Sequence, residues 1–264
     1  MQLGVCGDPA TAAAASQASF DFVEGTVGGL LKPREPEDAF RQALAAARAA
    51  ALPVSALNCF VPADLKITGP AVDLSVLSAY VATAMVRAEQ AGVETIVFGS
   101  GGARRIPDGF DRQAAHRQLV AFCAMAAPLA GAHGVTLVVE PLCRAECNVL
   151  NTVSECAALV REIAHPALRL LVDAYHLLRD GDSCADIATY ADLLAHVHIA
   201  TRDNRLPPGA EPCDFAPFFH ALAQGGYQGR ISIEAKITDP ARELPQAPAL
   251  MRRLIERGSN QEKT

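Results

Sequence analysis

The hydrophobic and polar positions of this chain alternate between two periods from one end to the other. Short apolar runs rich in Val, Ile, Leu and Phe are typical of buried strands, and longer alanine-rich stretches with helical spacing are typical of helices. Eight runs have the character of strands, and they fall at residues 3–7, 19–25, 53–60, 94–100, 134–140, 168–173, 195–200 and 230–235.

A stretch with helical periodicity follows each expected strand. These helices are expected near residues 9–17, 37–51, 73–91, 111–132, 152–164, 183–192, 214–224 and 241–257. Asp73 and the pair Asn151-Thr152 are suitable N-terminal caps, because their short polar side chains can accept hydrogen bonds from free backbone N–H groups. Gly92 is a suitable stop for the helix that ends there.

Eight β/α units in 264 residues predict a single-domain (β/α)8 TIM barrel that spans residues 1–264, with residues 258–264 as a flexible tail. A doubly wound sheet is the competing architecture. No GxGxxG or P-loop motif follows any of the strands, which weakens the nucleotide-binding form of that alternative. Ser100–Gly102 and Arg104-Arg105 are candidates for holding a phosphate group if the substrate carries one.

Composition bears on partners more than on fold. The formal net charge is -6 and there is no basic run, which argues against nucleic acid as a partner. No apolar stretch reaches the ~18 residues that a membrane span needs, and the start has no signal-peptide pattern. We therefore expect a cytoplasmic protein that acts on a small molecule. The eight cysteines are expected to be reduced thiols, because the chain is long and not cysteine-dense.

Four consecutive expected strands end in polar residues of the same parity. In each strand one alternating set is fully apolar and can face the helices, so the other set faces the barrel interior. The last members of the inward sets are Glu140, Asp173, His198 and Glu234. Since functional groups of such barrels come from the C-terminal ends of strands, these side chains are expected in one pocket. His196 has the same parity but lies one layer deeper, where a hydrogen-bonded core histidine is expected.

Three carboxylates in one pocket repel one another unless a cation is present. Oxygen-rich ligation with one imidazole suits a single divalent metal ion, with Mn²⁺ the first expectation and Mg²⁺, Co²⁺ or Zn²⁺ as alternatives. The sequence therefore predicts a metal held by Glu140, Asp173, His198 and Glu234.

Further polar residues flank this quartet. Glu146 lies in the loop after the fifth strand, His176 three residues after Asp173, and Arg205 in the loop after the seventh strand. These three are candidates for binding substrate hydroxyl groups. With weaker support, Glu24 and Asn58 are expected to line the same mouth.

The segments VVEPLCRAECNVLNT, LLVDAYHLL, HVHIATRDNRLPPG and GRISIEAK carry a family resemblance. The chain resembles the xylose-isomerase-like sugar isomerase/epimerase superfamily, and its motifs are nearest to the ketose 3-epimerases of D-tagatose and D-psicose type. The resemblance implies the same metal ligands, implies that Glu146, His176 and Arg205 contact substrate oxygens, and is compatible with a homodimer or homotetramer. Cys143 departs from it, since these epimerases commonly carry Asn there.

Such a site predicts a metal-dependent sugar epimerase or isomerase acting on a ketose or related polyol ketone. The reaction would pass through a metal-bound enediolate, with Glu140 and Glu234 as acid and base. An enzyme resembling hydroxypyruvate isomerase or inosose dehydratase is the nearest alternative. A metal-dependent hydrolase of AP-endonuclease type and an inactive sugar-binding protein are more distant alternatives.

Overall fold

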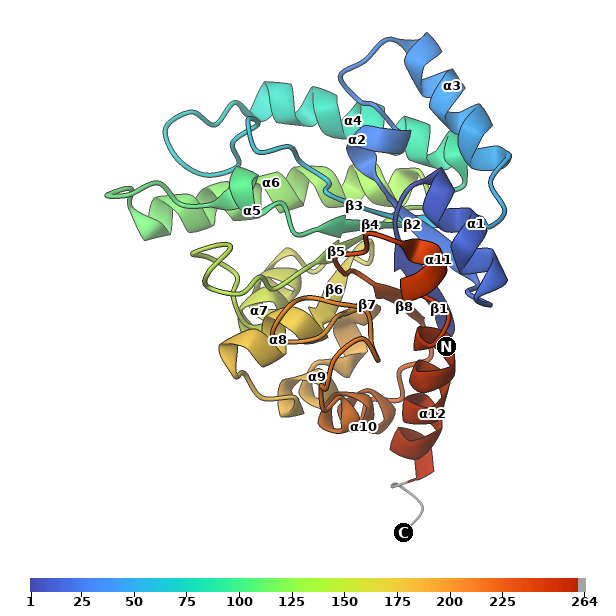
Figure 1. The fold of residues 1–264 in the computed structure, drawn as a ribbon. Coiled ribbons are helices and arrows are strands. Elements are labelled where there is room, and N and C mark those ends of the chain that lie inside the picture. The colour runs from blue at the N-terminus through green and yellow to red at the C-terminus, as the bar shows by residue number, and fades with distance from the viewer. Residues whose placement is uncertain (261–264) are drawn as a thin grey trace.

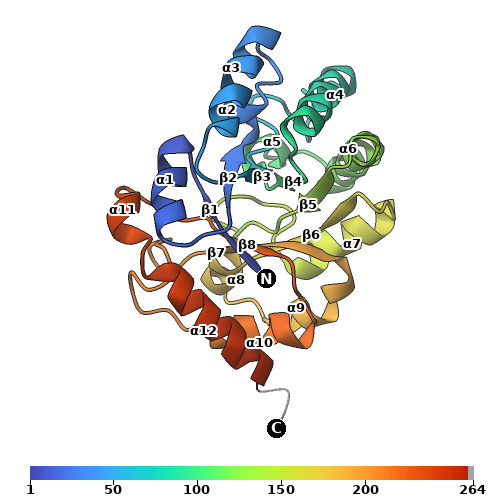
Figure 2. The same cartoon turned by 90° about the vertical axis from the view of Figure 1, so that its right-hand side faces the viewer.

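A computed structural model describes residues 1–260 and has eight parallel strands, which close into a barrel in chain order with β1 beside β8. Figures 1 and 2 show the strands at the centre and the helices around them. The strands are β1 (Gln2–Cys6), β2 (Phe22–Thr26), β3 (Val54–Asn58), β4 (Thr95–Phe98), β5 (Thr136–Val139), β6 (Leu168–Asp173), β7 (Leu194–Ile199) and β8 (Arg230–Ile233). The predicted (β/α)8 barrel is confirmed, and the doubly wound sheet is excluded by the closure.

The helices form the outer layer. They are α1 (Pro9–Gln17), α2 (Val27–Leu30), α3 (Glu37–Arg48), α4 (Leu74–Ala91), α5 (Gly101–Arg104), α6 (Arg112–Ala132), α7 (Val153–Ile163), α8 (Ala174–Asp180), α9 (Ala185–Thr189), α10 (Ala216–Gln224), α11 (Pro240–Glu243) and α12 (Ala247–Asn260). A 3-10 turn at Ala191–Leu193 follows α9.

The local signals that predicted the long helices are present as hydrogen bonds. The Asp73 side chain accepts from the backbone N–H groups of the first turn of α4, and Gly92 ends α4 in the left-handed conformation at φ 73. The Thr152 hydroxyl accepts from the N–H of Glu155 and caps α7. These caps stabilise helices whose apolar faces pack on the strands.

Helix boundaries depart from the predicted pattern in three places. The expected helix 241–257 is divided into α11 and α12 around Pro245, whose ring lacks an N–H group for a continuous helix. The expected helix 183–192 is a short α9 followed by the 3-10 turn. The short helices α2 and α8 follow their strands directly, α5 follows β4 after two residues, and all three are too short to show a clear period.

The two faces of the strands have the predicted parity. The outward residues of β5 to β8, such as Leu137 and Val197, belong to the large core between barrel and helices. Val97, Val138 and Leu171 form a separate small cluster inside the barrel. Alternation of side chains along each strand therefore places the polar strand ends in the barrel interior.

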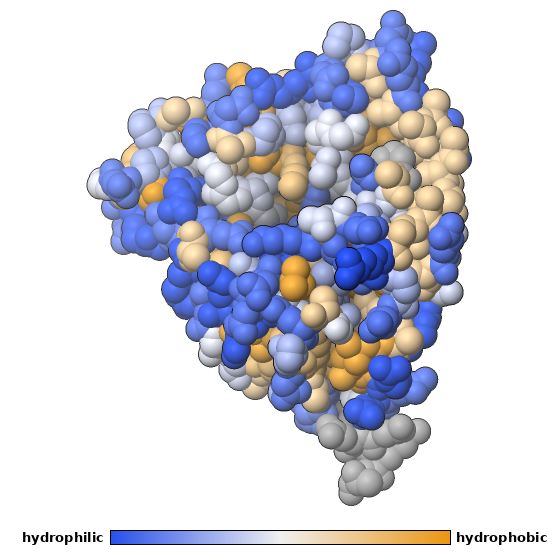
Figure 3. Space-filling view, viewed as in Figure 1, coloured by the Kyte–Doolittle hydropathy of each residue, from blue (hydrophilic) through white to orange (hydrophobic). Residues whose placement is uncertain are grey.

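At the C-terminal end, residues 258–260 were expected in the tail but form the last turn of α12, while residues 261–264 lie outside the described part of the chain. Among residues 1–260, none of the helices combines the length and apolar character that crossing a membrane requires. The face in Figure 3 is mostly hydrophilic, with a larger apolar area at its right-hand side.

Candidate active site

The four residues of the predicted quartet meet at the C-terminal ends of neighbouring strands. Glu140 and Glu234 directly follow β5 and β8, Asp173 ends β6, and His198 is the penultimate residue of β7. The register pairs Asp173 with His198, so both lie at one level of the barrel. Asp173 and His198 are fully buried, Glu140 is nearly so, and the Glu234 side chain is 20% exposed toward the mouth.

Distances show how tightly these side chains converge. Nδ1 of His198 lies 3.2 Å from Oε1 of Glu140 and 3.6 Å from Oε2 of Glu234. One oxygen each from Glu140, Asp173 and Glu234, together with a ring nitrogen of His176, lie within 4.8 Å of one another. The structure therefore brings the quartet and His176 into one cluster.

The hydrogen bonds of His176 determine which of its nitrogens faces the cluster. The backbone N–H of Cys143 donates to Nδ1 at 3.1 Å, and Nε2 lies 3.6 Å from Oδ2 of Asp173. Burial, reinforced by the charge of Arg205, lowers the pKa of His176 to about 3, so the ring is neutral at pH 7. A neutral ring that accepts at Nδ1 carries its proton on Nε2. His176 is therefore a hydrogen-bond donor toward the pocket.

The cluster has the character of a site for a divalent cation. Among the described residues, neither Oδ2 of Asp173 nor Nε2 of His176 has a hydrogen-bond partner, although both are buried. Burial and the charges of Glu140 and Glu234 raise the pKa of Asp173 to about 8. A cation among these oxygens would favour the ionised carboxylate and so offset that shift. Three carboxylates and one imidazole therefore fit a hard divalent ion.

The two glutamates of the cluster have opposite pKa shifts. Burial raises the pKa of Glu140, and the charge of Glu234 adds to this effect against the hydrogen bond from His198. For Glu234, burial also acts upward, but the charges of His198 and Arg205 and the hydrogen bond from His198 lower its pKa to about 2. The surroundings thus shift the pKa values of the two carboxyl groups in opposite directions.

Two of the three predicted substrate-binding residues, Arg205 and Glu146, lie at the rim of the cluster, whereas His176 is buried within it. The guanidinium of Arg205 forms ion pairs with Glu234 and, at 3.1 Å, with Glu146. It also lies 4.6 Å from the ring centre of Tyr175, which supports it by a cation–π contact. The backbone of Arg205 is in the left-handed region at φ 56, so its loop turns sharply back over the site.

On the opposite side of the mouth, Asn58 at the end of β3 donates from Nδ2 to Oε1 of Glu234 at 2.9 Å. Its Oδ1 is buried and has no hydrogen-bond partner within residues 1–260. The expectation that Asn58 lines the mouth is confirmed. Its amide and Arg205 together hold the carboxylate of Glu234 from two directions.

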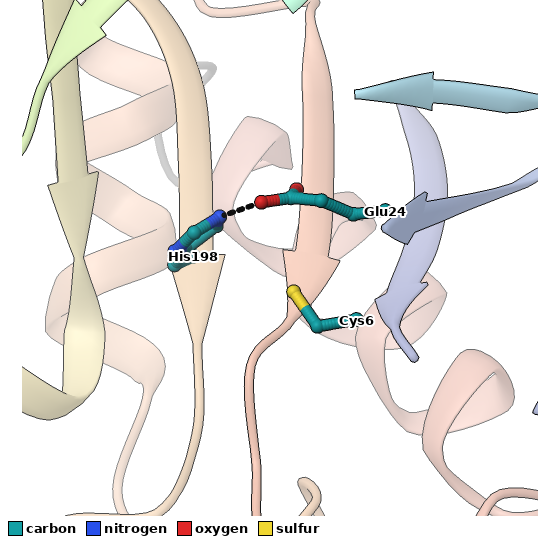
Figure 4. A group of neighbouring side chains, drawn as sticks. All are labelled: Cys6, Glu24 and His198. Carbon is teal, nitrogen blue, oxygen red and sulfur yellow. Dashed lines mark hydrogen bonds and ion pairs between the residues drawn. The ribbon is translucent and has the colours of Figure 1, made fainter. Parts of the chain in front are cut away.

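Glu24 lies deeper than expected, in the barrel interior rather than at the mouth. Its Oε1 lies 2.8 Å from Nε2 of His198, and its Oε2 lies 2.8 Å from Nε2 of His196. Figure 4 shows Glu24 and His198 pointing toward each other, with Cys6 beside them. His196 is fully buried in this layer, which confirms its assignment as a hydrogen-bonded core histidine.

The group Cys6, Glu24 and His198 also has the spacing of metal ligands. However, both oxygens of Glu24 already accept hydrogen bonds. Burial, together with the charge of Glu24, raises the pKa of the Cys6 thiol well above its ordinary value, so this thiol stays protonated. The group is therefore a hydrogen-bonded layer beneath the pocket rather than a second metal site.

Sequence reasoning missed the roles of Gly99, Arg104 and Tyr175. A Cβ atom at Gly99 would overlap Oε2 of Glu140, so glycine leaves the room that this carboxylate occupies. Arg104 is fully buried and donates to the carbonyl groups of Phe98, Glu140 and Leu150. The hypothesis that Arg104 holds a phosphate is wrong, because its guanidinium is enclosed and anchors the ends of β4 and β5. Glycine and arginine directly after a strand were the available signal.

A separate crevice of about 610 Å³ lies outside the barrel wall, between α1 and α3. Its lining is mostly alanine, glycine and valine, with Cys6 and Ala235 at the end nearest the mouth. Since no cluster of titratable groups faces it, we place the chemistry in the carboxylate cluster at the strand ends.

Comparison with known proteins agrees with this fold. Residues 12–254 match the family described as xylose isomerase-like TIM barrel, and the chain belongs to this family. A 3-dehydro-D-guloside 4-epimerase of Escherichia coli (strain K12) is 31% identical over 122 residues, which cover 45% of this chain and 46% of that protein. A ketose 3-epimerase of Arthrobacter globiformis is 34% identical over 103 residues, which cover 39% of this chain and 35% of that protein.

The matched segments thus span less than half the length of these two curated relatives. The fold of a solved structure matches this one over much more of the chain. The crystal structure of a D-psicose 3-epimerase in the presence of D-fructose superposes with a TM-score of 0.83 and 18% sequence identity, covering 97% of this chain and 99% of that one.

Proposed function

We propose that this protein is a divalent-metal-dependent sugar epimerase or isomerase that acts on a ketose or a related polyol ketone. The observation that carries the proposal is the convergence of carboxylate oxygens from Glu140, Asp173 and Glu234, with Nδ1 of His198 beside Glu140 and Glu234. Membership of the xylose isomerase-like family and the epimerase names of the relatives support it.

Glu140, Asp173, His198 and Glu234 would hold the cation, with Mn²⁺ expected first and Mg²⁺, Co²⁺ or Zn²⁺ as alternatives. When bound, a divalent ion supplies Lewis-acid polarisation of the substrate carbonyl and charge stabilisation of an enediolate. Asp173 has no partner for Oδ2 within the described chain, so this residue serves the proposed site without losing a hydrogen bond.

Glu140 and Glu234 are assigned as acid and base, because they approach the pocket from β5 and β8 on different sides. One carboxylate removes the proton from the carbon beside the carbonyl, and the other returns a proton to the opposite face. Return to the same carbon inverts its configuration, whereas return to the neighbouring carbon, with a proton passing from one oxygen to the other, moves the carbonyl. Their pKa values are shifted in opposite directions, upward for Glu140 and downward for Glu234, which supports different roles for the two groups.

His176, Arg205 and Glu146 are assigned to substrate binding. Nε2–H of His176 is aimed into the pocket without a protein acceptor among residues 1–260, so it can donate to a substrate oxygen. Arg205 and Glu146 form a charged pair at the mouth that can exchange its ion pair for hydrogen bonds to sugar hydroxyl groups.

The proposal is tested by hydrogen exchange. The protein is incubated with Mn²⁺ in D₂O with ketoses, ketose phosphates and keto-glycosides, and NMR is used to find deuterium beside the carbonyl. We expect exchange for at least one sugar class, and we expect Glu140→Gln and Glu234→Gln to lower it by at least about a hundred-fold. Glu256→Gln is the matched control, because Glu256 is exposed on α12.

Lack of exchange across the whole panel would contradict the enediolate chemistry. Exchange at the same rate in both glutamine variants would remove Glu140 and Glu234 from the reaction. The product separates the alternatives: an inverted carbon identifies an epimerase, a moved carbonyl an isomerase, and loss of water a dehydratase. Cleavage of abasic DNA would favour the hydrolase.

A further inference from the structure

A buried hydrogen-bond network lies one layer beneath the proposed metal site. The carboxylate of Glu24 accepts from Nε2 of His198 at 2.8 Å through Oε1, and from Nε2 of His196 at 2.8 Å and the hydroxyl of Ser232 at 2.6 Å through Oε2. Glu24, His196, His198 and Ser232 are all 0% exposed. They come from β2, β7 and β8, far apart in the sequence.

This network occupies one side of the barrel interior only. At the same depth, the interior wall formed by β4, β5 and β6 is apolar and consists of Val97, Val138 and Leu171. Burying a carboxylate destabilises a fold unless the carboxylate is fully hydrogen bonded, and apolar side chains would fill the same space at a lower cost in free energy. A polar layer confined to the side beneath His198 therefore points to a role for that histidine.

The geometry defines the orientation of the His198 ring. Nε2 of His198 donates to Glu24, and Nδ1 faces the carboxylates of Glu140 at 3.2 Å and Glu234 at 3.6 Å. A ring that binds a cation through Nδ1 gives up the proton on that nitrogen, and the bond to Glu24 keeps the remaining proton on Nε2. Rotation of the ring by half a turn would break the bond to Glu24.

We infer that Glu24 is a positioning residue for the proposed metal site. Glu24 holds His198 with Nδ1 toward the cation, and Ser232 and His196 in turn hold Glu24 in place. The inference rests on the proposed function, because it presumes that His198 is a metal ligand. Carboxylates that accept from the second nitrogen of a metal-bound histidine fix its tautomer and raise its basicity as a ligand.

The test measures metal binding rather than turnover. Isothermal titration of the full chain with Mn²⁺ is compared for wild type, Glu24→Gln and Ser232→Ala. We expect Glu24→Gln to weaken Mn²⁺ binding by about 10–100-fold. Ser232→Ala leaves the bond to His198 in place and removes only one restraint on Glu24, so a smaller loss is expected. Val97→Ala, at the same depth in the apolar wall, is the control for simple destabilisation and should leave the affinity unchanged.

A spectroscopic readout separates positioning from general structural support. With ¹⁵N-labelled histidine and Mg²⁺, wild-type His198 should show the tautomer protonated on Nε2, and Glu24→Gln should show a mixture of tautomers. If Glu24→Gln does not fold, Glu24→Asp takes its place in both measurements, because its shorter side chain keeps the charge but loses the reach to His198.

Unchanged affinity together with an unchanged tautomer in the folded variants would overturn the inference alone. Failure of wild-type protein to bind Mn²⁺, or binding that Glu140→Gln and Asp173→Asn leave intact, would instead overturn the proposed function. The two failures are therefore distinguishable.

Discussion

Replacement of Gly99 by alanine is the sharpest test of the site geometry. Gly99 follows β4, and a Cβ atom added there would lie closer than 3.0 Å to Oε2 of Glu140, a separation that real Cβ atoms essentially never show. Its φ is not in the positive region, so alanine brings no backbone strain of its own. Because non-bonded carbon atoms need about 3.5 Å, the carboxylate has to retreat by on the order of 1 Å.

A displacement of about 1 Å in a reacting group can cost about 100-fold in rate. We therefore expect Gly99→Ala to lower deuterium exchange into the substrate by roughly that factor and to weaken Mn²⁺ binding, with circular dichroism unchanged. Gly28→Ala in α2 is the matched control, since nothing lies within 4 Å of a Cβ atom at that position. A folded Gly99→Ala variant with wild-type exchange and wild-type metal affinity would refute the placement of Glu140 at the reacting centre.

Three further outcomes are expected. Because burial raises the pKa of Asp173 from 3.8 to about 8, the stability that its protonated carboxyl contributes is present at low pH and is lost as the pH rises through about 8. Melting temperatures measured without metal should therefore fall as the pH rises from about 4 to about 8, and Mn²⁺ or Asp173→Asn should remove the fall. Arg205→Ala should raise KM at least about ten-fold through the loss of a charged contact to substrate, whereas exposed Arg202→Ala should leave it unchanged in the same assay. Ala164 ends α7 in the left-handed region at φ 51, so Ala164→Gly should stabilise the fold by about 1 kcal/mol in urea unfolding, and a loss of stability would contradict this.

Much of the fold was readable from local pattern. The period-2 alternation of each strand identified which residues point inward, and register then placed Asp173 and His198 side by side. Glu140 and Glu234 followed from the same parity, because in a parallel barrel every strand delivers its last inward residue to the same end. The candidate quartet needed only the fold class and the side-chain alternation.

Contacts between distant strands were not readable in this way. The hydrogen bond between Glu24 and His198 joins residues 174 positions apart, and its existence depends on the stagger of β2 against β7 around the closed barrel. The enclosure of Arg104 also depends on carbonyl groups from three separate segments. Side-chain type identifies Glu24 and Arg104 as charged residues, but it does not indicate how deeply either side chain is buried.

The amino-acid sequence by itself determined the barrel, the end of the barrel where the candidate site lies, and the four side chains that face one pocket. Only the tertiary structure decided how the histidines divide their roles. His196 and His198 share one strand face and one parity, and they differ in their neighbours. Nδ1 of His198 lies near Glu140 and Glu234, whereas Glu24 accepts from Nε2 of both rings. The physical reason is that alternation sets direction along a strand, whereas closure of the sheet sets which side chains meet across it.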